Sequence, residues 1–220
     1  MKLILLLLIF QLASHSIFAQ VDKVNDSLIE EICTYLTDNN HLEDKVRYER
    51  IKARYIYPII YKIKNSKRDE AINFISARLQ RNCKEFDEMV ERLNPPKGDW
   101  VRIDKKQISS LSKEVCEDFL KIGKYYYFGA DGEKVYLTIE NNIWEDHFLD
   151  NTYSKLNLSW TDTCEFEIEF VESNNKIRRN FSKPGDKYKY QILEKDDNYY
   201  KLSVEIVQAN QFFTFKLYYR

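Results

Sequence analysis

The sequence predicts an α+β protein in which a helical bundle precedes an antiparallel up-and-down β-meander of about eight strands. Two observations lead to this fold class. Residues 20–122 carry apolar side chains at helical spacing, whereas residues 123–220 form short runs in which apolar and polar side chains alternate. Turn residues separate these runs, so successive strands should pair as hairpins and either close into a barrel or remain a strongly twisted sheet.

The first 19 residues have the form of a cleavable signal peptide. Lys2 supplies the positive start, Leu3–Phe10 is an apolar run, and Ala19 precedes the expected cleavage site. This run is short beside the roughly 20 apolar residues of a membrane-spanning helix, which favours cleavage over anchoring. We therefore expect a secreted protein, periplasmic or extracellular, with no transmembrane segment once the signal is removed.

Four cysteines follow the signal: Cys33, Cys83, Cys116 and Cys164. An even number in an exported protein favours disulfides over free thiols. Three connectivities are possible. We prefer Cys33–Cys83, joining two helices, and Cys116–Cys164, tying the last helix to the sheet. A metal site is disfavoured because no two of these cysteines lie close together in the sequence.

Apolar stripes predict the helices of the front half. The first stripe runs from Leu28 to Leu36, and the second begins near Leu42. Pro58 lies inside the second stripe. It should break or kink that helix just before Ile59, because proline lacks an N–H and crowds the preceding turn. Core packing explains such stripes, and a groove for a partner helix is the alternative.

Two further helices are expected before the sheet. The third should start after Ser66 and continue to Leu93, where Asn-Pro-Pro stops it. The last should run from about Ser110 to Ile122. Gly123 then suits the left-handed position that follows many helix ends. The short junction to the first strand suggests that these helices and the sheet pack closely.

The alternating runs place the strands of the back half. Glu165, Glu167 and Glu169 alternate with apolar residues in the fifth run, and lysines do so in the sixth. If these two strands pair, each opposite-charge pair should contribute roughly 0.2–1 kcal/mol and favour the register. The expected strands lie at about residues 124–128, 133–140, 143–148, 155–160, 164–170, 187–192, 200–206 and 213–219.

The layout of residues 124–220 resembles the lipocalin-like and fatty-acid-binding barrels in strand number and order. The segment Trp160–Phe166 is also similar to one in small uncharacterised exported bacterial proteins with such a β-domain. That resemblance implies a barrel but brings no function with it. The chain departs from lipocalins because the G-x-W entry is missing near the first strand and the strands are short.

Catalytic and nucleotide-binding motifs are missing from the sequence. There is no phosphate-binding glycine loop, no H-E-x-x-H and no G-x-S-x-G. We therefore expect no catalytic residues, no cofactor and no bound metal. His147 and Glu145 are the weak candidates for an unrecognised hydrolase. A formal net charge of −1 offers no basic footprint for nucleic acid.

Aromatic residues gather on the expected inner face of the strands. They either fill the core or line a pocket for a small apolar ligand. Tyrosines on the opposite face, such as Tyr126 and Tyr218, can mark a contact surface for a partner. The possible ligand-pocket residues are Trp160, Phe166, Phe170, Tyr188, Tyr190, Tyr200, Phe213 and Phe215.

Taken together, these patterns predict a non-enzymatic exported protein whose β-domain binds a small apolar ligand or a partner. The helical region, residues 20–122, would serve as a cap or docking element. The first alternative is an envelope interaction protein of the inhibitor, adaptor or immunity type, with no small-molecule site. The second is a hydrolase. Neither the ligand nor the oligomeric state follows from the sequence.

Overall fold

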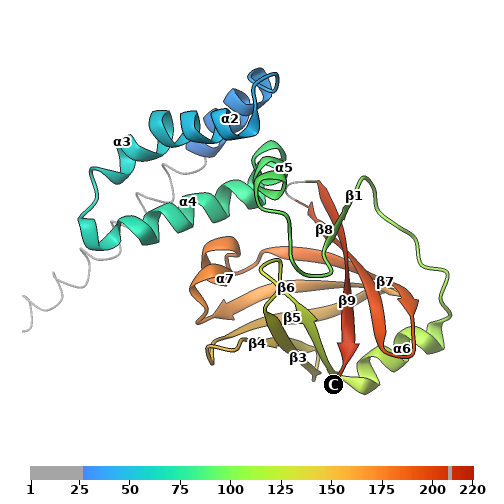
Figure 1. The fold of residues 1–220 in the computed structure, drawn as a ribbon. Coiled ribbons are helices and arrows are strands. Elements are labelled where there is room, and N and C mark those ends of the chain that lie inside the picture. The colour runs from blue at the N-terminus through green and yellow to red at the C-terminus, as the bar shows by residue number, and fades with distance from the viewer. Residues whose placement is uncertain (1–26, 208–209) are drawn as a thin grey trace, which may run out of the picture. The chain divides into compact units, whose positions relative to one another are not determined.

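The computed structural model describes residues 27–207 and 210–220 (Figure 1). The predicted export signal, residues 1–19, lies outside the described residues. The chain divides into two compact units, Met1–Leu79 and Gln80–Arg220. The first unit is helical in its described part, and the second contains the sheet, so the α+β prediction is confirmed.

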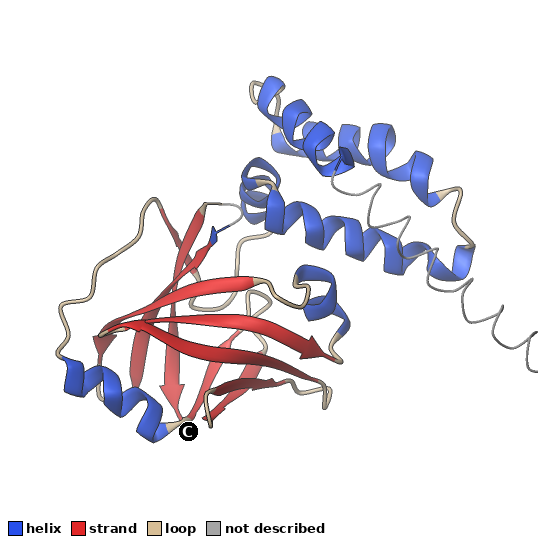
Figure 2. Cartoon of the chain, turned by 180° about the vertical axis from the view of Figure 1, so that it is seen from behind, coloured by secondary structure: helices blue, strands red, loops and turns tan. Residues whose placement is uncertain are grey.

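The first unit consists of helices joined by short turns. Residues 27–38 are helical, as predicted from the stripe that begins at Leu28. A long helical stretch follows, and a short 3₁₀ turn then leads into the next helix (Figure 2). These elements are α2 (Asp44–Ile51), the π-helix η1 (Lys52–Ile56), α3 (Tyr57–Ile60), the 3₁₀ turn η2 (Asn65–Lys67) and α4 (Arg68–Asn82).

Pro58 does not interrupt the long helix, so of the predicted break or kink before Ile59 the break is wrong. The residue occupies the first turn of α3, and the helical path continues to Tyr61. The turn immediately before it is a π-helix, η1, in place of α-helix. In an α-helix the proline ring would clash with the carbonyl group of residue i−4. The wider π-turn moves that carbonyl group out of its regular position, so the helix accommodates Pro58.

The predicted third helix is two helices. Cys83 separates α4 from α5 (Lys84–Leu93) because its backbone is extended, with φ −132° and ψ 101°. Because this position holds neither glycine nor proline, the helical spacing of apolar residues continues through it and the break was not predicted. Asn94 ends α5, as predicted.

Eight antiparallel strands form a closed barrel, which decides between the two architectures left open above (Figure 1). Each strand pairs with the next along the chain, and β9 returns to β2. Strand β1 (Val101–Ile103), which was not predicted, lies outside the ring on β9. The barrel strands are β2 (Lys124–Phe128), β3 (Lys134–Glu140), β4 (Ile143–His147), β5 (Tyr153–Asp162), β6 (Glu165–Ser173), β7 (Lys187–Lys195), β8 (Tyr199–Ile206) and β9 (Gln211–Tyr219).

The expected charge ladder is present on the outer face. Strands β6 and β7 pair so that Glu167 lies opposite Lys189 and Glu169 opposite Lys187. The Lys187 Nζ is 2.7 Å from Glu167 Oε1 and 3.6 Å from Glu169 Oε2. The predicted register is therefore confirmed. Because these side chains are largely in water, they contribute modestly to stability and mainly disfavour a slipped pairing.

Helix α6 (Lys113–Ile122) covers one end of the barrel (Figure 2). Gly123 ends it at φ 62°, as predicted, and its N–H donates to the carbonyl of Phe119. A disulfide joins Cys116 to Cys164, with a Cα–Cα separation of 5.4 Å. Cys33 and Cys83 are also disulfide-bonded, and no cysteine of the described chain is free. The prediction that all four cysteines form disulfides is confirmed.

The barrel has one weak seam, between its first and last strands. Strands β2 and β9 share only the pairs Tyr125↔Tyr219 and Tyr126↔Tyr218. Beyond that point β1 takes over the free edge of β9. Trp100, just before β1, stacks on Phe215 with ring centroids 4.3 Å apart, and its indole N–H donates to the carbonyl of Phe128 at 2.8 Å. One side chain thus packs on β9 and binds the end of β2.

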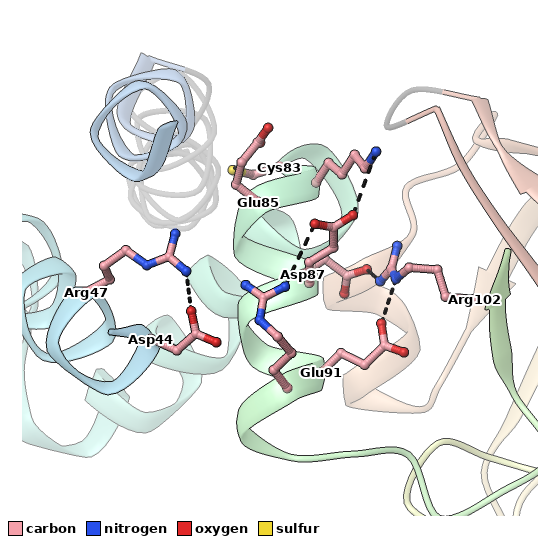
Figure 3. A network of polar contacts seen from close by, with 10 residues as sticks. Asp44, Arg47, Cys83, Glu85, Asp87, Glu91 and Arg102 are labelled. Carbon is pink, nitrogen blue, oxygen red and sulfur yellow. Dashed lines mark hydrogen bonds and ion pairs between the residues drawn. The ribbon is translucent and has the colours of Figure 1, made fainter. Parts of the chain in front are cut away.

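An ion-pair cluster attaches α5 to β1 (Figure 3). Arg102 donates through Nη2 to Asp87 and through Nε to Glu91, both at 2.6 Å. Burial raises the pKa of Asp87, and the guanidinium opposes that rise. These two charge-assisted hydrogen bonds from one guanidinium hold β1 against α5.

Candidate functional site

The two ends of the barrel differ in chemistry. At the end covered by α6, hereafter the α6 end, Phe119 packs against Tyr125, Phe166 and Tyr200. At the other end, hereafter the polar end, Tyr127, Asp146 and Tyr188 lie on β2, β4 and β7, and charged side chains surround them. We take the polar end as the candidate functional site because buried charge is rare and costly unless a function or a network requires it.

Asp146 is the centre of the polar end. It points into the barrel from β4 and is 6% exposed. The Trp144 indole N–H donates to its Oδ1 at 3.0 Å, and the Tyr127 hydroxyl also bonds to its carboxyl group. Burial raises the pKa of Asp146, while Arg178 and the two hydrogen bonds favour the charged form. Burial raises the pKa of Tyr127, and the same carboxyl group adds to that rise.

Arg178 brings a positive charge to this carboxyl group from the short helix α7 (Lys176–Phe181). Its Nη2 donates to the Tyr127 hydroxyl at 3.4 Å, and its guanidinium carbon lies 5.2 Å from the centre of the Phe148 ring. Among the described residues this is the one hydrogen bond of the guanidinium. Because a guanidinium has five N–H donors, most of them remain available to a ligand or to water.

Asn175 positions α7. Its Oδ1 accepts from the backbone N–H groups of Ile177 at 3.1 Å and Arg178 at 3.2 Å, which makes it the N-cap of the helix. Its Nδ2 donates to Thr152 Oγ1 at 2.7 Å. The turn between β4 and β5 therefore holds the start of α7, and through it the direction of the Arg178 side chain.

A second arginine, this one buried, adjoins the barrel wall at the polar end. Arg81 is fully buried, donates to the Tyr188 hydroxyl and lies 3.3 Å from the Asp186 carboxylate. The Tyr188 hydroxyl is 2.5 Å from Ser182 Oγ. Burial raises the pKa of Tyr188. Two arginines and two aspartates thus face one set of tyrosine hydroxyls.

Gln211 adds an unsatisfied amide at the same end. It begins β9 opposite Ile206, a core residue, so its side chain faces the barrel interior. The residue is 2% exposed, and neither its amide oxygen nor its amide nitrogen has a hydrogen-bond partner within the described chain. Buried polar atoms of this kind normally have a partner, so this amide is a polar group that the described chain leaves unsatisfied.

The predicted pocket residues all lie in or against the barrel core. Trp160, Phe166 and Tyr200 lie toward the α6 end, and Phe170, Tyr188 and Phe213 toward the polar end. Tyr190 stacks on Phe166 at 5.3 Å and lies 6.0 Å from the ring of Phe215. The rings are brought together as expected. Their role in holding a ligand stays a prediction.

Two weaker sequence candidates face outward. Glu145 and His147 flank Asp146 on β4, and the His147 Nε2 is 3.7 Å from Glu145 Oε1. Both side chains lie on the convex outer wall of the barrel. The hydrolase hypothesis stays a prediction, and within the described chain no third acid, histidine or cysteine joins them in a metal-binding group.

A row of rings crosses the outer wall, and it includes the tyrosines expected on that face. Tyr126 stacks on Tyr218 at 5.2 Å, and a lysine or arginine lies over several of the other rings. The row follows the strand register through six neighbouring strands. Its members, in spatial order, are Tyr199, Tyr218, Tyr126, Tyr136, His147 and Tyr153.

Sequence reasoning missed the residues at the centre of the polar end. Asp146 alternates with Trp144 on the inward side of β4, so a carboxylate in an apolar register was the available signal. Arg178 lies between two predicted strands, on a helix of only six residues, which is too short to show an apolar stripe. Arg81 lay in a predicted helix among other charged residues.

Comparison of the chain with protein-family models, with curated proteins and with solved structures found no match. Within the part of the chain that the structure describes, no helix is both long and apolar enough to cross a membrane. The candidate site therefore rests on its own geometry.

Proposed function

We propose that this is an exported, non-enzymatic binding protein with a lipocalin-like β-domain, of the kind found in exported bacterial proteins. Its barrel takes a small, mainly apolar ligand whose polar head sits at the polar end. The observation that carries this proposal is the buried group formed by Tyr127, Trp144 and Asp146, with the half-buried Arg178 beside it, at one end of an aromatic core.

The charges favour a hydrogen-bond-accepting head. Arg178 and the Tyr127 hydroxyl both offer donors at the polar end, and a charge-assisted bond from a guanidinium is about twice as strong as a neutral one. Burial raises the pKa of Asp146, which favours the neutral carboxyl group and so favours an acceptor beside it. A carboxylate, sulfonate or phosphate head meets these conditions.

The aromatic core favours an apolar body. Rings of Trp144, Phe166 and Tyr190 are mutually packed within 6.1 Å, and they lie beneath the polar group. Ligand sites generally combine such apolar walls with a few convergent polar atoms. Because the core is densely filled, the ligand is expected to be small or to displace side chains.

Anilinonaphthalene sulfonate tests the proposal, since it joins an anionic head to an aromatic body. Mature protein, residues 20–220, from an oxidising compartment should bind it with saturable fluorescence. Arg178→Gln should weaken binding at least about tenfold, which corresponds to about 1.4 kcal/mol. The matched control is Arg179→Gln, because Arg179 is the exposed neighbour on the same helix.

Near-ultraviolet circular dichroism must remain native in both variants, because partly unfolded proteins also bind this dye. Equal affinities for the two arginine variants would remove the proposed head-group site. Native mass spectrometry of the unmodified protein then reports whether a natural ligand of defined mass accompanies it. Amino-terminal sequencing of the same sample should start at Gln20 if the signal is cleaved as proposed.

The outer tyrosine row favours a second function, an envelope interaction protein. Half-buried tyrosines on a sheet face are common at protein contacts. A Tyr126→Ala/Tyr218→Ala variant should lose a partner that the unmodified protein recovers by crosslinking in its native compartment. Tyr61→Ala is the control, since Tyr61 is 66% exposed in the first unit. Repeated recovery of no partner would count against this function.

A further inference from the structure

Two aliphatic side chains extend into solvent at the polar end of the barrel. Ile177, on α7, is 71% exposed, and Leu149, in the turn between β4 and β5, is 60% exposed. A single exposed apolar residue is ordinary on a protein surface, so neither is informative alone. What distinguishes this pair is that the fold holds both residues at one place and surrounds them with positive charge.

Hydrogen bonds join the two segments that carry these side chains. The Asn175 Nδ2 donates to Thr152 Oγ1 at 2.7 Å, and the Asn174 Oδ1 accepts from the backbone N–H of Tyr153 at 2.6 Å. Both bonds run between the β4–β5 turn and the start of α7. Residues 148–152 and 174–183, hereafter the α7 ridge, therefore form one surface that presents both aliphatic side chains.

The α7 ridge is basic. It contains four basic residues and one acidic residue, which gives it a formal charge of +3 in a chain whose formal net charge is −1. The basic residues are Lys176, Arg178, Arg179 and Lys183, and the acidic residue is Asp150. Helix α6, at the other end of the barrel, has two basic and three acidic residues, so the positive excess is local to the polar end.

Apolar side chains within a basic surface complement an anionic lipid surface. Aliphatic groups can enter the boundary between head groups and acyl chains, while lysine and arginine stay at the level of the lipid phosphates. Each basic residue close to an anionic membrane adds to the attraction. A stable protein interface would instead bury about 800 Å² on each partner. The ridge, made of one turn and one short helix, suits the lipid surface better.

We propose that the α7 ridge docks this protein on the surface of an anionic membrane. Ile177 and Leu149 enter the head-group boundary, and Lys176 and the other basic residues of the ridge lie against the lipid phosphates. The contact is peripheral and reversible. It requires no ligand in the barrel, so the proposal stands independently of the function proposed above.

Cosedimentation of the mature protein with vesicles tests the proposal. Vesicles of phosphatidylcholine and phosphatidylglycerol in equal parts should bind the protein, and pure phosphatidylcholine should bind it at least about tenfold more weakly. High salt should also weaken binding, because it screens the attraction. Ile177→Ser/Leu149→Ser and Lys176→Glu should each reduce the affinity at least about fivefold. These side chains are exposed, so the fold should be retained.

The matched controls lie away from the ridge. Ile108→Ser alters an aliphatic residue that is 87% exposed in the segment leading to α6, and Lys113→Glu reverses an exposed charge at the start of α6. Both should leave vesicle binding unchanged. No binding to anionic vesicles, or equal losses in the ridge and control variants, overturns the proposal.

Polyglutamate separates a lipid surface from an acidic polypeptide. Binding of polyglutamate that depends on Lys176, with no binding to the vesicles, would assign the ridge to a protein partner and overturn the lipid proposal. Dye titration of the same variants reports on the barrel separately. Loss of the dye site with intact vesicle binding would count only against the function proposed above.

Discussion

The two ends of the barrel differ in the hydrogen-bond partners of their interior tyrosine hydroxyls. At the α6 end, the tyrosine hydroxyls that reach the interior donate to helix carbonyls: Tyr125 to Phe119 at 2.6 Å and Tyr200 to Val115 at 3.2 Å. At the polar end, the hydroxyls of Tyr127 and Tyr188 bond to charged side chains. The first arrangement is closed and neutral, and the second keeps charge beneath a six-residue helix. Stability should therefore depend on the α6 end and binding on the polar end.

The largest expected effect is at the α6 end. Phe119→Ala removes a fully buried ring that packs on three other aromatic side chains, which should reduce the free energy of unfolding by about 3–5 kcal/mol. Urea denaturation followed by tryptophan fluorescence measures this loss. Ile122→Ala is the control, because Ile122 is 39% exposed on the same helix and should cost much less. Similar losses for the two variants would show that α6 is not a packed cover.

The next largest effect is expected from removing the Cys116–Cys164 disulfide at the same end. Cys116→Ser/Cys164→Ser opens a loop with a sequence separation of 48, and the stability lost should be about 2–4 kcal/mol. Denaturation curves of the variant and of the parent give the difference. Dye affinity at the polar end should hardly change in native conditions. A large loss of affinity would mean that the two ends are not independent.

Asp146→Asn tests how burial of a carboxyl group at the polar end affects stability. Burial raises the pKa of Asp146 above the ordinary 3.8, so the folded protein holds this proton more tightly than the unfolded chain. The parent should therefore lose stability as the pH rises from about 3.8 through the native pKa, and asparagine removes this contribution. Each unit of pKa corresponds to about 1.4 kcal/mol.

Urea denaturation across the acidic to neutral range gives the difference between the Asp146→Asn protein and the parent. The stability of the variant relative to the parent should grow over that window. Other carboxylates, including Asp87, cancel because both proteins contain them. Parallel pH curves would contradict the inferred environment of Asp146.

The smallest expected effect is on α7. Asn175→Ala removes the N-cap of this helix and its link to Thr152, and caps are typically worth about 1 kcal/mol. We expect a small change in the free energy of unfolding but a clear loss of dye affinity, because Arg178 loses its support. Fluorescence titration beside denaturation separates the two. A loss of stability without a loss of affinity would place the ligand elsewhere.

The strands were predictable from sequence because most inward residues are apolar and each turn has a chemical signal. Asn141 and Asn142, read as a turn, adopt φ 51° and 61°, as a tight hairpin requires. Closure was not predictable, since it depends on pairing between β2 and β9 across the domain. The break at Cys83 and the passage through Pro58 were missed because neighbouring structure overrode the local pattern.

The polar end was harder to foresee than the barrel. Its side chains come from β2, β4, β7, α4 and α7, and no short motif joins them. Arg81 and Tyr188, for instance, are 107 residues apart in the sequence. The one local signal is an aspartate in an inward register beside Trp144, and this signal is weak in a chain with 35 acidic residues.

The two-pair seam between β2 and β9 also gives the barrel an order of assembly. Every other neighbouring pair in the ring joins strands that are consecutive along the chain, whereas β2 and β9 are its first and last strands. Loop-closure entropy makes such distant contacts form late. Until β9 docks, β2 and β8 are open edges that can capture a strand of another molecule. Changes that weaken β9 should therefore appear first as aggregation during refolding, before any deficit is measurable in the folded protein.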